Sequence, residues 1–285
     1  TETFSKNQPV VLWFESGNAT NFKPDRVVVN GRVYPAKPSG AGYQVALNGF
    51  TQTGDAEIKV EQVILENGKA FFPETDNTLT VMILKEIPSV THLYAQEDAE
   101  NGQFHLSFQL SDPDAALSGR KIVIKNAAGK TVGQRSIEPD DLPDGAFSGT
   151  VPLTDTGLTT SYTIQVMADC DLSLDGSQQE LQKILAAQEV LAQPRALITA
   201  GRAGEAYAEK GSDVELFYEI SSNVEADLSR LVVGHRELTA EPWQEGTWKV
   251  TATAPEQAGK QTFTLSQLVF ADGTVVNVSH DISME

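Results

Sequence analysis

The sequence predicts an all-β protein of three tandem β-sandwich domains, of which the first and the third are copies of one unit. Short apolar runs rich in branched and aromatic residues recur along the 285 residues, and such runs favour strands. Turn signals separate them at intervals of about eight to twelve residues, which is typical of a sandwich. The two ends of the chain also resemble each other. We expect domains at residues 1–88, 89–198 and 199–285.

The similarity between the two ends keeps a constant offset. At a shift of 204 residues, ten of the 33 residues from 6 to 38 are identical without a gap. PVVLWFE (9–15) then falls on DVELFYE (213–219). After one inserted residue the match resumes at a shift of 205. A register this long indicates a duplicated unit. We therefore expect Trp13, which aligns with Phe217, and Trp248, which aligns with Tyr43, to pack in cores.

Each copy is expected to contain five or more strands. RVVVNGRVY (26–34) predicts two short strands around Asn30-Gly31, the strongest short-range signal for a hairpin. The second copy has Gly234-His235 at this turn. GYQVAL (42–47) alternates between apolar and polar residues, as expected for a sheet with one solvated face.

The middle segment has its own pattern. LTDTGLTTSYTIQVMADCDL (153–172) places Leu158 before a turn and Tyr162 at the start of a strand. Residues 178–193 are ambiguous, because their apolar spacing and composition also favour a helix. A sandwich needs a last strand after the one that Tyr162 opens. We therefore expect a strand at 184–192 with a loop before it, and the helix stays an alternative.

The segment around Leu158 and Tyr162 resembles fibronectin type III and related immunoglobulin-like domains, in which such a tyrosine pins a corner to the backbone through its hydroxyl. The whole arrangement, carried by RVVVNGRVY, SRLVVGHREL (229–238) and SFQLSDPDAALSG (107–119), resembles the repeat regions of secreted and cell-wall-attached surface proteins of Gram-positive bacteria, adhesins among them. This resemblance implies tandem immunoglobulin-like domains outside the cell that serve as a spacer or an adhesive stalk. It implies no site at the level of residues.

Charge and composition narrow the partners. The net charge is −18 and the isoelectric point is near 4.6, so phosphate backbones and anionic membranes would be repelled. No apolar run is long enough to span a bilayer. We expect no nucleic-acid partner, no membrane insertion and a monomer, and we regard a host protein, a cell-wall protein or a glycan as a possible partner. Because Thr1 is not an initiator methionine, we also expect a fragment of a longer protein.

No motif in the sequence predicts catalysis. The nucleophile-elbow, phosphate-loop, dinucleotide and paired-cysteine motifs are absent, and His92, His105, His235 and His280 fit no zinc spacing. The one cysteine, Cys170, lies at the end of an alternating run, and we interpret it as a structural residue of a strand rather than a nucleophile. We therefore expect a protein that is not an enzyme, with no catalytic residues, no cofactor and no metal site.

Two features of the sequence leave ligand binding as an alternative. Asp112 and Asp114 fall in a predicted loop, where carboxylates can hold Ca²⁺, but they supply only two of the six or more oxygens required; a turn-starting role is the alternative. Trp243 aligns with Ser39 and lies in EPWQEG, which predicts an exposed contact residue on a loop or a lid over one end of a sandwich.

Three functions are compatible with these residues. The first is a non-catalytic surface module that acts as an adhesive or spacer stalk. The alternative is a carbohydrate-binding accessory region of a secreted glycosidase or protease, with Trp243 as the candidate contact. A hydrolase with an unusual site is the third, and no acid–base pair can be assigned to it.

Overall fold

The structure, a computed structural model, describes residues 2–15, 22–73, 77–155, 157–174 and 176–284. Apart from two short 3₁₀ turns, the regular structure of these residues is strand, which confirms the all-β prediction. No helix in this described portion is long and apolar enough to cross a membrane. The buried apolar side chains form three separate clusters.

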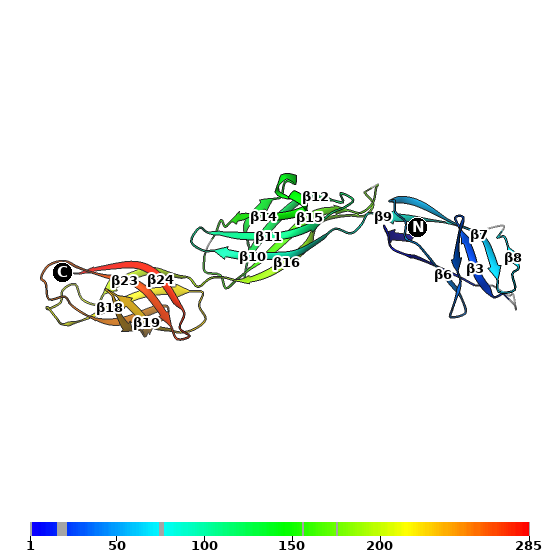
Figure 1. The fold of residues 1–285 in the computed structure, drawn as a ribbon. Coiled ribbons are helices and arrows are strands. Elements are labelled where there is room, and N and C mark those ends of the chain that lie inside the picture. Colours follow the sequence, from blue (N-terminus) through cyan, green and yellow to red (C-terminus); the bar gives the residue numbers. More distant parts are fainter. Residues whose placement is uncertain (1, 16–21, 74–76, 156, 175, 285) are drawn as a thin grey trace.

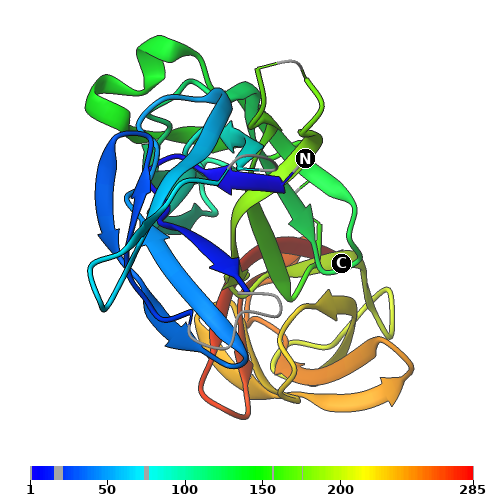
Figure 2. The ribbon, with the colours of Figure 1, turned by 90° about the vertical axis from the view of Figure 1, so that its right-hand side faces the viewer.

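Each cluster draws its residues from one stretch of the chain. We call these stretches the first part (residues 2–84), the middle part (89–191) and the third part (196–284). The three parts lie in a row in Figure 1. Figure 2 views the same chain from the end that the first part occupies.

The first part contains two facing sheets. Its strands are β1 (Glu2–Ser5), β2 (Val10–Phe14), β3 (Pro24–Val29), β4 (Arg32–Pro35), β5 (Lys37–Ser39), β6 (Gly42–Leu47), β7 (Gly54–Leu65), β8 (Ala70–Phe71) and β9 (Thr78–Leu84). One sheet has the order β1-β9-β7-β3-β4, with β8 on β7, and the other has the order β2-β6-β5. Alternate apolar residues of both sheets fill the space between them, as in a sandwich.

The middle part contains seven strands in sheets of three and four. Its strands are β10 (Ser89–Asp98), β11 (Gln103–Ser111), β12 (Leu117–Asn126), β13 (Thr131–Ser136), β14 (Ala146–Pro152), β15 (Ser161–Asp171) and β16 (Gln179–Leu191). The orders are β10-β11-β14 and β13-β12-β15-β16. Two 3₁₀ turns, Pro139–Asp141 and Pro143–Gly145, precede β14.

The third part has the strand order of an immunoglobulin sandwich. Its strands are β17 (Ala196–Ala203), β18 (Asp213–Ser222), β19 (Leu228–Val233), β20 (Arg236–Thr239), β21 (Glu241–Gln244), β22 (Thr247–Thr253), β23 (Gln261–Phe270) and β24 (Val275–Met284). The first, second, sixth and fifth of these strands form one sheet, and the other four form the second sheet, which is the immunoglobulin grouping. Because β17 begins at Ala196, this part starts three residues before the expected position 199.

The first and third parts pair equivalent residues. Val10 lies opposite Leu47, and Val214 lies opposite Ala252, so the pairs differ by the offsets 204 and 205 at which the sequence matches itself. A bulge follows Val28 in β3, and the same irregularity follows Val232 in β19. The turns agree as well. Both residues of Asn30-Gly31 and of Gly234-His235 have positive φ, as a two-residue hairpin turn with right-handed twist requires.

The two parts differ at their first strand. β17 pairs antiparallel with β18, whereas β1 pairs parallel with β9 in the opposite sheet. Among the described residues, β2 therefore pairs only with β6, on one side.

Two expectations, one about β16 and one about β2, are wrong. The loop expected before residue 184 is strand, because β16 begins at Gln179 and continues the ladder on β15 through two bulges. Tertiary pairing overrides the weak alternation of residues 179–183. Trp13 does not pack in a core. It is 54% exposed, because Val10, Leu12 and Phe14 take the inward positions of β2 and alternation turns Trp13 outward.

Trp248 has a different position. It lies on β22, is half-buried and packs against the apolar cluster of the third part, as the alignment with Tyr43 predicts.

Candidate functional site

Trp243 lies on a strand, not on a loop. It is part of β21, the outer strand of the sheet β17-β18-β22-β21, and 51% of its surface is exposed. Its ring meets Phe217 of β18 edge-on, with 5.4 Å between the ring centroids. Lys249 of β22 places its Nζ 5.5 Å from the centroid of the Trp243 ring. Trp243 thus lies exposed on the outer face of the sheet beside a charged neighbour.

Phe217 shows how this outer face is covered. Its side chain points away from the core, yet it is only 5% exposed. The guanidinium carbon of Arg202 lies 4.4 Å above its ring, and the backbone of Gly204 approaches so closely that a Cβ there would lie 3.3 Å from the ring. Arg202, Phe217 and Trp243 therefore form one continuous outer layer, held together by cation–π and edge-to-face contacts.

A groove of about 840 Å³ runs along this layer. Arg202, Trp243 and the exposed Tyr207 line it together with four carboxylates, those of Glu205, Glu209, Asp213 and Glu215. Lys249 donates to Glu215 and Glu241 at 3.2 Å each, and these bonds, Glu215 first, raise the pKa of Lys249. The groove therefore combines exposed aromatic rings with hydrogen-bond acceptors and the guanidinium of Arg202.

Asp112 and Asp114 are both engaged in protein contacts. Asp112 accepts hydrogen bonds from the backbone N–H groups of Ala116 and Leu117 at 2.7 and 3.2 Å, and from Arg120 at 3.0 Å. It therefore organises the loop before β12. In the described residues no three His, Cys, Asp or Glu side chains come close enough to share a metal ion.

Asp114 connects the first part to the middle part. Its Oδ1 accepts a hydrogen bond from Lys6 Nζ at 2.6 Å, and its Oδ2 accepts one from the Glu86 N–H at 2.8 Å. Beside it, the Lys85 N–H donates to the Leu172 carbonyl at 2.8 Å. The bond from Glu86, and next the ammonium of Lys6, lower the pKa of Asp114. We call this cluster of Lys6, Lys85, Glu86, Asp114 and Leu172 the first joint.

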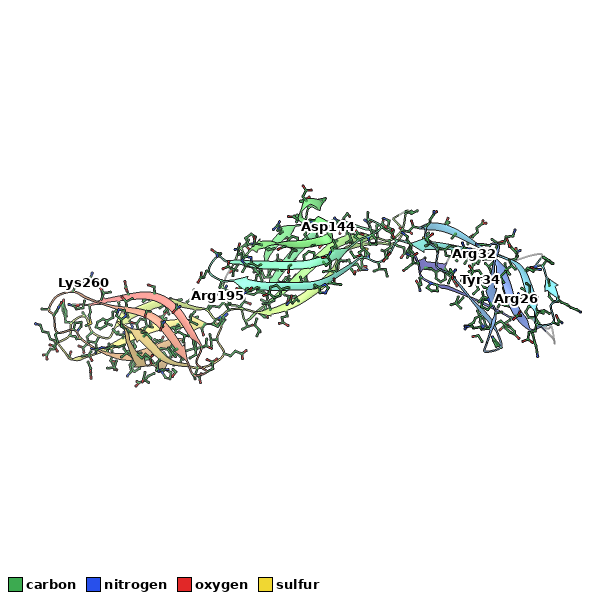
Figure 3. The ribbon with its side chains drawn as sticks, viewed as in Figure 1. Arg26, Arg32, Tyr34, Asp144, Arg195 and Lys260 are labelled. Carbon is green, nitrogen blue, oxygen red and sulfur yellow. The ribbon has the colours of Figure 1, made fainter. Side chains whose placement is uncertain are left out.

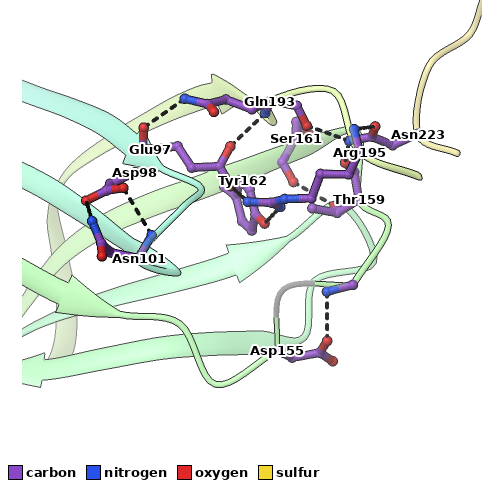
Figure 4. Close-up of polar contacts among 11 residues, drawn as sticks. Glu97, Asp98, Asn101, Asp155, Thr159, Ser161, Tyr162, Gln193, Arg195 and Asn223 are labelled. Carbon is purple, nitrogen blue, oxygen red and sulfur yellow. Dashed lines mark hydrogen bonds and ion pairs between the residues drawn. The ribbon is translucent and has the colours of Figure 1, made fainter. Parts of the chain in front are cut away.

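A second polar cluster lies between the middle and third parts (Figure 4). Arg195 pairs with Glu97, and its Nη1 donates to the Tyr162 hydroxyl at 2.9 Å. Figure 3 shows Arg195 where the chain passes from one part to the next. The expectation that Tyr162 pins its corner to the backbone is therefore corrected: the partner of its hydroxyl is a side chain. Burial raises the pKa of the Tyr162 hydroxyl.

Asn223 closes this cluster from the third part. Its Nδ2 donates to the carbonyls of Thr159 at 2.7 Å and Gln193 at 3.0 Å, while its Oδ1 accepts from the Arg195 N–H at 2.6 Å. On the other side, Glu97 accepts a 2.6 Å bond from the Gln193 N–H. We call Glu97, Thr159, Tyr162, Gln193, Arg195 and Asn223 the second joint.

Sequence reasoning missed both joints. The only signal in the sequence was Arg195 itself. It follows Pro194 in a short connection between two apolar strands, where a charged residue has no obvious solvated face. The partners are distant in sequence, Glu97 on β10 and Asn223 in the loop after β18, so the sequence offers no spacing that would predict them.

The histidines and Cys170 occupy structural positions. His105 lies 3.4 Å from Asp98, His235 forms the β19–β20 turn, and His280 packs on Gly201; His92 lies in the bulge of β10. Cys170 is 1% exposed on β15, and its burial is the main reason that the pKa of its thiol is raised. A buried thiol with a raised pKa is a poor nucleophile.

No model of a known protein family matches this chain, and no curated protein matches it. Solved structures that match this chain include one of a 1.5-MDa bacterial ice-binding adhesin, with 15% identity over 99% of this chain and 92% of that one and a TM-score of 0.27. Fibronectin(III)-like modules of Clostridium thermocellum CbhA align over 67% of this chain and 87% of theirs, with 14% identity and a TM-score of 0.24. These values concern shape alone and carry no functional argument.

Proposed function

We propose that this chain is a non-catalytic extracellular module of a bacterial surface protein and that it acts as a stiff spacer. The observation that carries the proposal is the second joint. Parts that meet only through a flexible linker would sample many orientations. Here one asparagine of the third part, Asn223, is hydrogen-bonded both to Thr159 of the middle part and to Gln193 of the connection.

The energetics of the second joint favour one orientation. The side chains of Glu97 and Arg195 are 2% and 16% exposed, so each charge depends on the other for compensation. Separating a buried pair costs about 3–5 kcal/mol, because a charge is left buried and unpaired. A swing of the third part that removed Arg195 from Glu97 would meet this cost.

The first joint supports the same conclusion at the other end of the middle part. The loop of Asp114 is fixed by Asp112 and Arg120, and Asp114 then bonds both to Lys6 and to the backbone of Glu86. A carboxylate held from both sides restricts rotation about the connection more than a single exposed ion pair would.

Spin-label distances test the spacer function. Labels at Gln134→Cys and Lys260→Cys, both exposed, report on the middle and third parts, while Cys170 is too buried to react. We expect a narrow distance distribution in the native chain and a broad one in Asn223→Ala, which removes the bridge without leaving a charge buried.

Asn101→Ala is the matched control. Asn101 also makes side-chain hydrogen bonds, but to Asp98 in the same part, so this variant should keep the narrow distribution. A broad distribution in the native chain, or a distribution in Asn223→Ala as narrow as in the control, would refute the spacer proposal.

A second candidate function is binding of a glycan in the groove beside Trp243. The observation that favours it is the exposed ring of Trp243 next to Tyr207 and four carboxylates, because an aromatic face and acceptors suit a sugar ring. This reading would make the chain an accessory module of a secreted enzyme or a glycan-directed adhesin.

A glycan array tests this candidate. We expect Trp243→Ala to abolish any binding of the full chain, while Trp13→Ala, the matched change of an exposed tryptophan in the first part, leaves the binding intact. Silence of the native chain across plant, bacterial and host glycans, or equal binding by both variants, would eliminate the candidate.

A further inference from the structure

The first part has an open sheet edge at the position where the third part has an additional strand. In the third part, β17 lies on β18, with Arg202 opposite Phe217 and Ala203 opposite Leu216. In the first part the equivalent edge belongs to β2, which pairs only with β6 among the described residues. An edge without a partner presents a row of unpaired N–H and C=O groups.

The hydrogen-bond alternation shows which groups of β2 face this edge. In the third part Gly204 N–H donates to the Glu215 carbonyl at 2.8 Å on the β17 side, whereas Ile220 N–H bonds to Gly246 on the β22 side. Odd-numbered residues of β18 therefore bond to β17. Their counterparts in β2, at the offset of 204, are Val11 and Trp13.

The side chains along β2 are correspondingly less covered. Leu12 and Phe14 are half-buried, whereas their counterparts Leu216 and Tyr218 are fully buried. Trp13 is exposed where Phe217 is covered by Arg202 of β17. The missing cover therefore affects both faces of the strand.

A cavity opens into the core along the same edge. It measures about 410 Å³ and is lined by Leu12 and Phe14 of β2, by Val45 and Val63 of the core, and by Pro73 and Asn77 near the start of β9. In the third part β17 packs beside β24, the counterpart of β9, and Ala196, Ile198 and Ala203 pack against the core there. Among the described residues, ten form the buried cluster of the first part and eighteen that of the third, so the first core is the less complete one.

We propose that the β2 edge of the first part accepts an extended segment of another polypeptide as an additional antiparallel strand. The segment carries apolar residues at alternate positions, which enter the cavity beside Leu12 and Phe14, and its backbone bonds to Val11 and Trp13. The third part supports this occupant because β17 has the same role on β18. Strand addition of this kind derives affinity from the main chain and specificity from alternate side chains. The inference is independent of the spacer function.

The chain itself suggests a selective probe. A Cβ added at Gly201 of β17 would lie 2.5 Å from the ring of His280, so a copy of residues 195–204 with Val at the position of Gly201 would clash with His280 if it replaced β17 in the third part. Residue 201 lies opposite Tyr218, which corresponds to Phe14 in the lining of the cavity, so the valine would face the cavity. This peptide, labelled with fluorescein, is the probe.

Fluorescence anisotropy with the full chain measures its binding. We expect saturable binding, and hydrogen exchange should slow over residues 10–15 of the first part. The matched control peptide is N-methylated at the positions of Arg202 and Gly204, which keeps every side chain but removes the donors toward β2; its affinity should fall at least about tenfold, as expected for the loss of two hydrogen bonds. The Val11→Pro variant of the chain should bind the unmethylated probe with similarly reduced affinity. Circular dichroism checks that this variant folds.

Several outcomes would overturn the proposal. These are no binding of the probe, equal binding of the N-methylated peptide, and protection that appears on β18 in place of β2. Self-association of the chain, seen by sedimentation and abolished by Val11→Pro, would identify a second copy as the occupant and equally reject the segment proposed here. Hydrogen exchange on the native chain keeps the test decisive if Val11→Pro does not fold.

Discussion

At the scale of single residues, two buried tyrosines differ in whether their hydroxyl has a hydrogen-bond partner. Tyr162 and Tyr218 are both fully buried. The Tyr162 hydroxyl accepts a bond from Arg195, whereas the Tyr218 hydroxyl has no hydrogen-bond partner among the described residues, and burial raises its pKa well above the ordinary value. The first part has Phe14 at the position equivalent to Tyr218, so a ring without a hydroxyl is compatible with this fold.

Tyr218→Phe should therefore leave the third part as stable as before or stabilise it by about 1 kcal/mol, because an unpaired buried hydroxyl costs about 1–3 kcal/mol. Tyr162→Phe is the control and should destabilise by about 1 kcal/mol through the lost bond to Arg195. Scanning calorimetry of the full chain measures both. A clear loss of stability in Tyr218→Phe would mean that its hydroxyl has a partner in solution.

Residues also show what a sequence can predict about the candidate site. The mismatch of Trp243 with Ser39 in the alignment of the two ends correctly indicated a residue outside the core. The cover that Arg202 gives Phe217 could not be predicted, because it depends on β17 lying on β18, and the first part does not repeat that pairing.

At the scale of elements, strand existence was more predictable than strand partners. The dipeptide Asn30-Gly31 predicts the hairpin, and the alternation of residues 42–47 predicts β6, because both signals are local. The partner of the first strand was not predictable, because β1 and β17 choose different sheets. Similarly, residues 179–183 are strand only because β15 offers an edge to pair with.

The packing of β17 against β24 depends on one glycine. Gly201 faces His280, whose ring would lie 2.5 Å from an added Cβ. Gly201→Ala should destabilise the third part by about 1–3 kcal/mol, the usual cost of overpacking. His280→Ala combined with Gly201→Ala should recover most of this loss. Urea unfolding followed by the fluorescence of Trp243 and Trp248 measures the double-mutant cycle. Additive losses would show that the two side chains do not meet.

At the scale of the whole molecule, the three parts form a row (Figure 1) and are connected by two joints of different chemistry. In the second joint Arg195, Gln193 and Asn223 are bonded across the connection in a largely buried network. In the first joint a partly exposed carboxylate, Asp114, supplies two of the bonds. The two joints should therefore respond differently to acid.

The first joint should loosen as the pH falls. The Glu86 N–H and then Lys6 lower the pKa of Asp114 below its ordinary value near 3.8. A carboxyl with a lowered pKa stabilises the joined state above its ordinary pKa and loses that contribution as the pH falls through the lowered one. Labels at Lys69→Cys and Gln134→Cys should give a narrow distance distribution at about pH 6 and a broader one at about pH 3.

Asp114→Asn should be broad at both pH values, because the amide cannot pair with the Lys6 ammonium, whereas Asp155→Asn, which removes an exposed ion pair to Lys130 within the middle part, should behave as the native chain does. Circular dichroism at the low pH separates loosening of the joint from unfolding. If the native distribution stays narrow at low pH while Asp114→Asn is also narrow, Lys85 and Leu172 hold the first joint through their backbone bond alone, and the carboxylate has no mechanical role.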